Sequence, residues 1–139
     1  MPPDPTDEDY RHLLELRTGL RRFLRWSEDQ AKAAGLTPAQ HQLLLAIRGH
    51  PDPRGPTVGD VARSLLLRHH SVVGLVDRAE QSGLVRRQRD PANHSRVHVR
   101  LTARGAERLE TLSALHLAWL AEHGGELADV WGSFGAAAP

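Results

Sequence analysis

Arginine and histidine are the functional side chains that stand out in this sequence, and the arginines are concentrated in its middle. Residues 54–108 contain 11 arginines and five acidic residues, a balance of +6, whereas the rest of the chain carries −5 and the whole chain +1. A cationic segment on a nearly neutral scaffold is typical of a protein that binds a polyanion through one face. We therefore expect a nucleic-acid-binding surface within this segment.

Other kinds of chemistry find little support in the residue types. The chain has no cysteine, which excludes disulfides, thiolate metal sites and cysteine redox chemistry. It has no glycine-rich phosphate loop and no G-x-S-x-G nucleophile motif, so we expect no enzyme and no cofactor. Nine histidines are present, but none of them pair at i, i+4 on a predicted helix, so no metal site is predicted. The alternative that His12, His41 and His116 converge from different helices stays open.

Two helices are expected before the cationic segment. Apolar residues recur at helical spacing and predict a long helix over residues 7–34, ended by Gly35. A second helix should begin at Thr37, with Gln40 closing a capping box, and run to Gly49. No stretch approaches the roughly 20 apolar residues of a membrane span, and the N-terminus lacks a signal-peptide pattern, so we expect a cytoplasmic protein.

Two short helices joined by a tight turn come next. Residues 50–56 contain three prolines, so no helix could continue through them. Thr57 then caps a short helix, and after a turn at Leu67 a second helix runs from about His69 to Ser82. This arrangement is typical of a helix-turn-helix motif.

The spacing of apolar residues then changes from helical to alternating. Leu84 and Val85 begin one strand, residues 97–101 form another, and a turn at 90–94 joins them into a hairpin. A long helix follows from Thr102, and Gly124-Gly125 is expected to break it and leave a short last helix. The fold predicted is mainly α with a small β-hairpin wing, a winged helix-turn-helix in a single domain of 1–139.

The chain resembles the MarR family of bacterial transcriptional regulators over residues 36–108. The stretches that carry the resemblance are LTPAQ at 36–40, VGDVA at 58–62, LVDRAEQSGLVRR at 75–87 and VHVRLTARG at 97–105. The resemblance implies a homodimer built by helices 7–35 and 103–135, with residues 36–102 as the DNA-binding lobe. It also implies a pseudo-palindromic double-stranded DNA operator, repression of nearby genes, and release by a small-molecule effector.

DNA binding by such a fold needs cations near phosphates, side chains that reach base edges, and a wing cation that senses groove width. The residues expected to contact DNA from the recognition helix are Arg68, His69, His70, Ser71, Val73 and Gly74. Those expected from the wing are Arg89, His94, Ser95, Arg96 and His98. Strand alternation places His94, Arg96, His98 and Arg100 on one solvated face. Gly74 would let the helix backbone come close to a groove.

The sequence departs from the family's pattern at two of these places. At the wing tip the family usually has Asp, any residue, then Arg, whereas this chain has Asn93-His94-Ser95 and an arginine one position later. At the start of the recognition helix, Arg68 stands where the family often has a capping serine, and Ser71 is an alternative cap. The effector site implied by the resemblance involves Trp26, His41 and His116, although packing is the simpler role for Trp26.

Three alternatives follow from the same residues. Arg87 lies on the side of Val85 and could pair with Asp60 or Asp77, and Asp77-Arg78 could form an internal ion pair. The histidines at 69, 70, 94 and 98 would suit a DNA-binding protein tuned by pH or abundance without an effector. A winged helix can also serve as a protein-interaction module, although a basic exposed face favours DNA.

Overall fold

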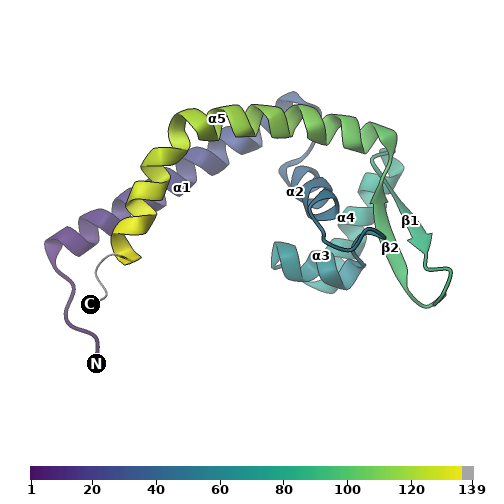
Figure 1. Ribbon diagram of the computed structural model, residues 1–139, viewed down its shortest axis with the longest axis horizontal. Helices are drawn as coiled ribbons and strands as arrows, with labels where there is room; N and C mark the ends of the chain where they lie inside the picture. Colours follow the sequence, from purple (N-terminus) through teal and green to yellow (C-terminus); the bar gives the residue numbers. More distant parts are fainter. Residues whose placement is uncertain (136–139) are drawn as a thin grey trace. The chain divides into compact units, whose positions relative to one another are not determined.

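The computed structural model describes residues 1–135, in which five helices and one antiparallel hairpin are found (Figure 1). The elements are α1 (Asp7–Ala33), α2 (Pro38–Arg48), α3 (Val58–Leu65), α4 (His69–Gln81), β1 (Val85–Arg89), β2 (Val97–Leu101) and α5 (Ala103–Gly135). This confirms the predicted fold, mainly helical with a small hairpin wing. None of the described helices is long and apolar enough to cross a membrane.

Two compact units make up the chain. Residues 31–113 form one of them, here called the lobe, and residues 1–30 with the chain from 114 onward form the other, here called the arm. The lobe has a core of fully or almost fully buried apolar side chains drawn from each of its elements. Its most completely buried large side chains include Leu43, Leu44, Val61, Val72, Val76, Leu84, Val99 and Leu112.

The predicted helix starts and stops in the lobe are confirmed by their hydrogen bonds. Thr37 and Gln40 form a complete capping box at the start of α2, and Thr57 and Asp60 form another at the start of α3. Gly35 ends α1 with a positive φ of 79°. These local signals act within one turn of helix, so they can be recognised without knowing the tertiary structure.

The start of α4 differs from one expectation. Arg68 is the N-cap residue, with extended backbone and no side-chain cap bond, and Val72 N donates to its carbonyl oxygen at 3.2 Å. Ser71 already lies in the first turn of the helix, so the expectation that it caps α4 is wrong. Two residues before Arg68, Leu66 ends α3 in the left-handed region at φ 54°.

The hairpin gains a third segment that the sequence pattern did not predict. β1 and β2 pair in the register Val85 with Leu101 and Arg89 with Val97. On the other edge of β2, Val99 N donates to Pro56 O at 2.7 Å, and Thr57 forms an isolated antiparallel bridge with His98. The proline-rich loop before α3 therefore lies along β2 and covers its outer edge.

The last helix is longer than predicted. α5 runs through Gly124-Gly125 without interruption, so the expected break and separate last helix are wrong. Two glycines cost roughly 1 kcal/mol each relative to alanine, which packing can outweigh. That packing is close: a Cβ built on Gly19 of α1 would lie 2.7 Å from Leu127 Cδ2 of α5.

Candidate nucleic-acid interface

The exposed start of α4 collects most of the residues predicted for the recognition helix. Arg68, His69, His70 and Ser71 are exposed, whereas Val73 and Gly74 are half-buried. The opposite face of α4 is buried in the lobe through Val72, Leu75, Val76 and Ala79. One face of α4 therefore packs in the core, and the polar first turn of α4 faces outward.

Arg78 also lies on this surface, although the sequence pattern suggested an internal ion pair with Asp77 for it. A Cβ on Gly74 would lie 3.3 Å from Arg78 Nη1, so the guanidinium folds back over Gly74 toward the start of α4. Asp77, its expected partner, instead pairs with Arg87. Among residues 1–135, Arg78 makes no ion pair, and it is exposed. The missing side chain at Gly74 thus makes room for a cation on the outer face.

Arg87 has a structural role, which confirms one of its two expected partners. Its guanidinium donates to Asp77 Oδ1 at 2.7 Å and to Glu80 Oε1 at 2.8 Å. Its backbone N–H also donates to Glu80 Oε2. Asp60, the other candidate, is paired with Arg63. Arg87 therefore joins β1 to α4, and its charge is already compensated.

The wing tip is exposed throughout and is shaped by short-range hydrogen bonds. Asn93 Oδ1 accepts from the backbone N–H and the hydroxyl of Ser95, and Asn93 O accepts from Arg96 N at 2.9 Å. Arg89 Nη1 donates to His94 O at 3.2 Å, which braces the tip from β1. Ser95 is occupied within the turn, while the side chains of His94 and Arg96 are exposed.

His98 does not lie on the exposed face, so that prediction is wrong. The side chain is 4% exposed. Its Nδ1 contacts Gly55 O at 2.8 Å, and its Nε2 lies 3.5 Å from Asp90 Oδ2. Arg100, which shares this face of the hairpin, donates to Pro53 O and is only half-buried. Strand alternation correctly placed His98 and Arg100 on the same face of the hairpin. This face is not solvated, because the loop at 52–56 covers it.

Two charged residues that the sequence reading did not single out lie at the base of the wing. Asp90 is 4% exposed and accepts from Arg54 Nη1 at 3.0 Å and from the backbone N–H of Ala92 at 2.8 Å. The Ala92 N–H, with help from His98 and Arg54, holds the pKa of Asp90 below its usual value. The Asp-Pro turn was visible in the sequence, but a partner 36 residues earlier was not.

The three residues named for an effector site are distributed over the two units. In the arm, Trp26 and His116 have ring centroids 4.8 Å apart, and Ser27 Oγ lies 2.7 Å from His116 Nε2. Trp26 also stacks on Trp119 at 5.1 Å, consistent with a packing role. His41 is buried in the lobe. Within the described part of the chain, no group of His, Asp or Glu could hold a metal ion.

Comparison with known proteins identifies relatives of the segment that contains α3, α4 and β1. The model of the MarR family matches residues 34–94, which include the whole helix-turn-helix motif and the first half of the wing. Residues 34–94, which are 61 of the 139 residues, are therefore similar to the MarR family. No functionally curated protein matches it.

Several solved structures share the fold. A MarR-family protein from Bacillus stearothermophilus is 27% identical, with a TM-score of 0.71 over 85% of this chain and 81% of that one. A mutant of MepR from S. aureus, bound to an oligodeoxyribonucleotide, is 19% identical with a TM-score of 0.67, over 96% and 93%. CouR from Rhodococcus jostii, bound to p-coumaroyl-CoA, is 21% identical with a TM-score of 0.66, over 98% and 85%.

Proposed function

We propose that this chain is a transcriptional regulator of the MarR type, and not an enzyme, that binds double-stranded DNA through the start of α4 and the wing. The observation that carries the proposal is a set of exposed cationic or titratable side chains on these two elements, for which residues 1–135 provide no acidic partner. On α4 they are Arg68, His69, His70 and Arg78, and on the wing they are His94 and Arg96. Ser71, Val73 and Gly74 would lie against base edges, with Arg89 and Ser95 supporting the wing tip.

The proposed geometry requires a homodimer. Two recognition helices must lie about 34 Å apart to enter successive major grooves of a pseudo-palindromic operator. The arm supports this role, because a large share of its apolar surface is exposed in one chain. Its exposed apolar residues include Leu13, Leu14, Leu20, Leu24, Leu115, Leu117, Leu120, Trp131 and Phe134. Surfaces of this kind are typical of interaction sites.

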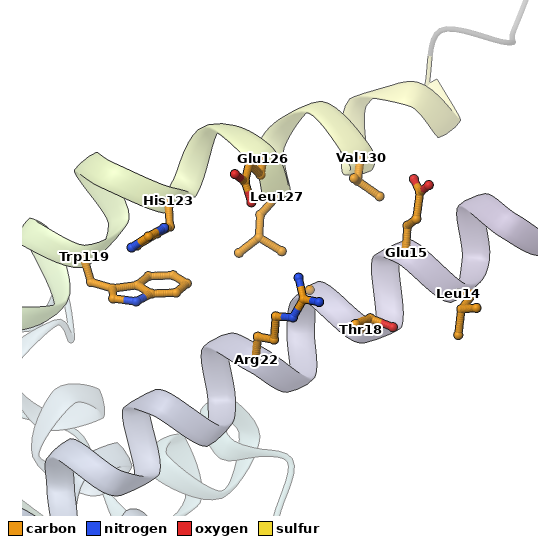
Figure 2. Close-up of a pocket in the computed structure, with 10 residues that line it drawn as sticks. Leu14, Glu15, Thr18, Arg22, Trp119, His123, Glu126, Leu127 and Val130 are labelled. Atoms are coloured by element: carbon orange, nitrogen blue, oxygen red, sulfur yellow. The ribbon is translucent and has the colours of Figure 1, made fainter.

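A groove in the arm adds to this argument. It has a volume of about 550 Å³ and lies between α1 and α5, lined by Leu14, Trp119, Leu127 and Val130 among others (Figure 2). Side chains of a second copy would fill it. Residues 7–35 and 103–135 would then provide dimerisation, and residues 36–102 would provide DNA binding.

A small-molecule effector would regulate binding. CouR with p-coumaroyl-CoA is a MarR-fold protein with a bound small molecule, and MepR with an oligodeoxyribonucleotide is one with bound DNA. In this chain the site would include Trp26 and His116 of the arm, whose ring centroids are 4.8 Å apart. Binding of the regulator to an operator in the cytoplasm would repress the adjacent gene until the effector releases it.

The experiment that tests DNA binding is fluorescence anisotropy on a duplex from the upstream region of the gene, against a scrambled duplex, over a salt series. We expect preferential, salt-sensitive binding. Arg96→Gln should weaken binding and reduce the slope of log K against log salt by about 1 if the side chain meets one phosphate. Arg87→Gln is the matched control, because that arginine is already paired, and its slope should not change. Equal binding to both duplexes would contradict a specific regulator.

A second candidate is a DNA-binding protein without an effector, tuned by pH. The exposed His69, His70 and His94 favour it, because histidine gains a positive charge between pH 8 and 6. DNA affinity should then rise as pH falls at constant salt. The His69→Gln, His70→Gln, His94→Gln triple variant should lose that part of the rise, and an unchanged profile would remove these side chains from the interface.

A further inference from the structure

The base of the wing holds a buried acid facing a buried histidine. Asp90 follows β1, His98 lies on β2, and each side chain is 4% exposed. Asp90 Oδ2 lies 3.5 Å from His98 Nε2 and 3.0 Å from Arg54 Nη1. Its other oxygen accepts from Ala92 N at 2.8 Å, and Asp90 N donates to Arg96 O at 2.9 Å. Asp90 therefore connects both sides of the wing tip to the loop before α3.

The surroundings of His98 determine how many protons its ring can use. Nδ1 lies 2.8 Å from Gly55 O, and a carbonyl oxygen only accepts, so Nδ1 carries a hydrogen. Nε2 faces the Asp90 carboxylate, which also only accepts when ionised. A neutral imidazole has one N–H and would turn a lone pair toward the carboxylate. Only the doubly protonated ring donates to both neighbours.

Charged groups from every neighbouring segment face this pair. The loop at 52–56 contributes Arg54 and Asp52, which pair with each other at 2.8 Å, and β2 contributes Arg100, which donates to Pro53 O. β1 places Arg86 opposite Arg100 and Gln88 opposite His98. Arg54 stays charged at all accessible pH and keeps its bond to Asp90. Loss of the histidine proton would therefore loosen the wing base without releasing it completely.

We propose that His98 is a positioning residue of the wing, which in its doubly protonated form ties the loop at 52–56 to Asp90 and holds the wing for DNA. The wing becomes less ordered, and DNA affinity falls, as rising pH removes this proton. The part that concerns DNA rests on the proposed function. This effect differs from a phosphate contact by the exposed histidines, since His98 is buried and acts through Asp90.

The first test needs no DNA. NMR of the ring nitrogens in the full chain, from pH 5 to 8.5, assigns His98 by the signal that disappears in His98→Gln. We expect Nδ1 to stay protonated and Nε2 to titrate. The amide shifts of Ala92 and Arg96 should change with the same midpoint. A neutral ring protonated on Nε2, or wing amides that do not respond, would overturn the proposal.

Two variants should move the midpoint in opposite directions. Asp90→Asn replaces the carboxylate with an amide that can donate to the neutral ring, so the midpoint should move to lower pH. Arg54→Gln removes a competing cation and leaves the carboxylate, so the midpoint should move to higher pH. Because the two shifts have opposite signs, general loosening of the fold cannot produce both. An unchanged midpoint in both folded variants would exclude the Asp90 contact.

The second test uses DNA affinity in the triple variant His69→Gln, His70→Gln, His94→Gln, which removes the exposed histidines. Anisotropy at constant ionic strength should still show a severalfold loss of DNA affinity from pH 6 to 8. Adding His98→Gln should make the DNA affinity independent of pH over this range. A flat profile before His98 is changed would overturn the positioning role. Absence of DNA binding at any pH would instead contradict the proposed function, while the NMR test of the His98–Asp90 contact would stand.

Discussion

Leu66 occupies a backbone conformation that its side chain makes costly. Its φ of 54° lies in the left-handed region, and the side chain is 91% exposed, so almost no packing compensates for the strain. A left-handed conformation costs an L-residue roughly 1–2 kcal/mol. The turn between α3 and α4 nevertheless needs this conformation, since Leu66 N donates to Ala62 O to end α3. The residue that orients the recognition helix is therefore strained.

We predict that Leu66→Gly stabilises the protein. Glycine adopts this conformation without strain but loses about 0.5–1 kcal/mol more entropy on folding, so the net gain should be about 0.5–1 kcal/mol. Urea unfolding followed by circular dichroism measures it. Leu66→Ala is the matched control, because it removes the same exposed side chain and keeps the strain, and it should change stability little. A loss of stability in Leu66→Gly would mean that the leucine has a partner in the assembled protein.

At the scale of elements, α3 depends on its capping box. Thr57 Oγ1 accepts from Asp60 N at 3.2 Å, and Asp60 Oδ2 accepts from Thr57 N at 3.0 Å. Thr57→Ala should lower the free energy of unfolding, measured in urea, by about 1 kcal/mol. Thr57→Ser keeps the hydroxyl and should therefore keep most of this stabilisation. A cost equal in both variants would show that the methyl group, rather than the hydroxyl, stabilises the helix start.

The same capping box predicts that the free energy of unfolding decreases at acidic pH. The Thr57 N–H, followed by the Thr57 hydroxyl and the Arg63 pair, lowers the pKa of Asp60 below its ordinary value of 3.8. A lowered folded-state pKa contributes stability above the unfolded value, and this is lost as pH falls below about 4. Asp60→Asn should remove this part of the acid dependence.

α5 contains two glycines for which the same substitution should have opposite effects. A Cβ on Gly105 would lie 2.0 Å from Leu84 O, a backbone atom that cannot easily move, so Gly105→Ala should be strongly destabilising. A Cβ on Gly125 would meet nothing within 4 Å, so Gly125→Ala should raise stability by up to about 1 kcal/mol. Thermal unfolding of the two variants compares them directly. A similar loss in both would point to a second copy packed against Gly125.

The elements also show how far a sequence can predict this structure. Caps at Thr37 and Thr57 and the stop at Gly35 act within one turn, so the bounds of the first four helices were predicted to within a residue or two. The continuity of α5 and the burial of His98 depend on segments distant in sequence, and hydrophobic spacing does not contain that information. Of the predicted interface, α4 could be placed from its pattern, whereas Arg54 and Asp90 required the folded loop.

At the scale of the whole molecule, the arm should be stable only when a second copy covers it. Leu117 is 69% exposed in the single chain and is one of many exposed apolar residues of the arm, a set that is typical of an interaction site. We predict a dimer in sedimentation at micromolar concentration and a thermal midpoint that rises with protein concentration. Leu117→Glu should weaken the dimer and reduce the rise of the thermal midpoint with protein concentration. Leu66→Glu is the matched control in the lobe and should leave the dimer intact, whereas a monomeric wild type would contradict the arrangement.

The loop that runs along β2 has one more consequence, which concerns contacts between separate molecules. A free strand edge offers unpaired N–H and C=O groups to any other strand, and it is a common start of aggregation. Here Pro56 and Thr57 occupy the outer edge of β2. β1, with the sequence VRRQR, carries the exposed Arg86 and Arg89 beside the paired Arg87, and these two like charges repel an identical strand. The hairpin can therefore project from the lobe with little tendency to recruit the hairpins of other molecules.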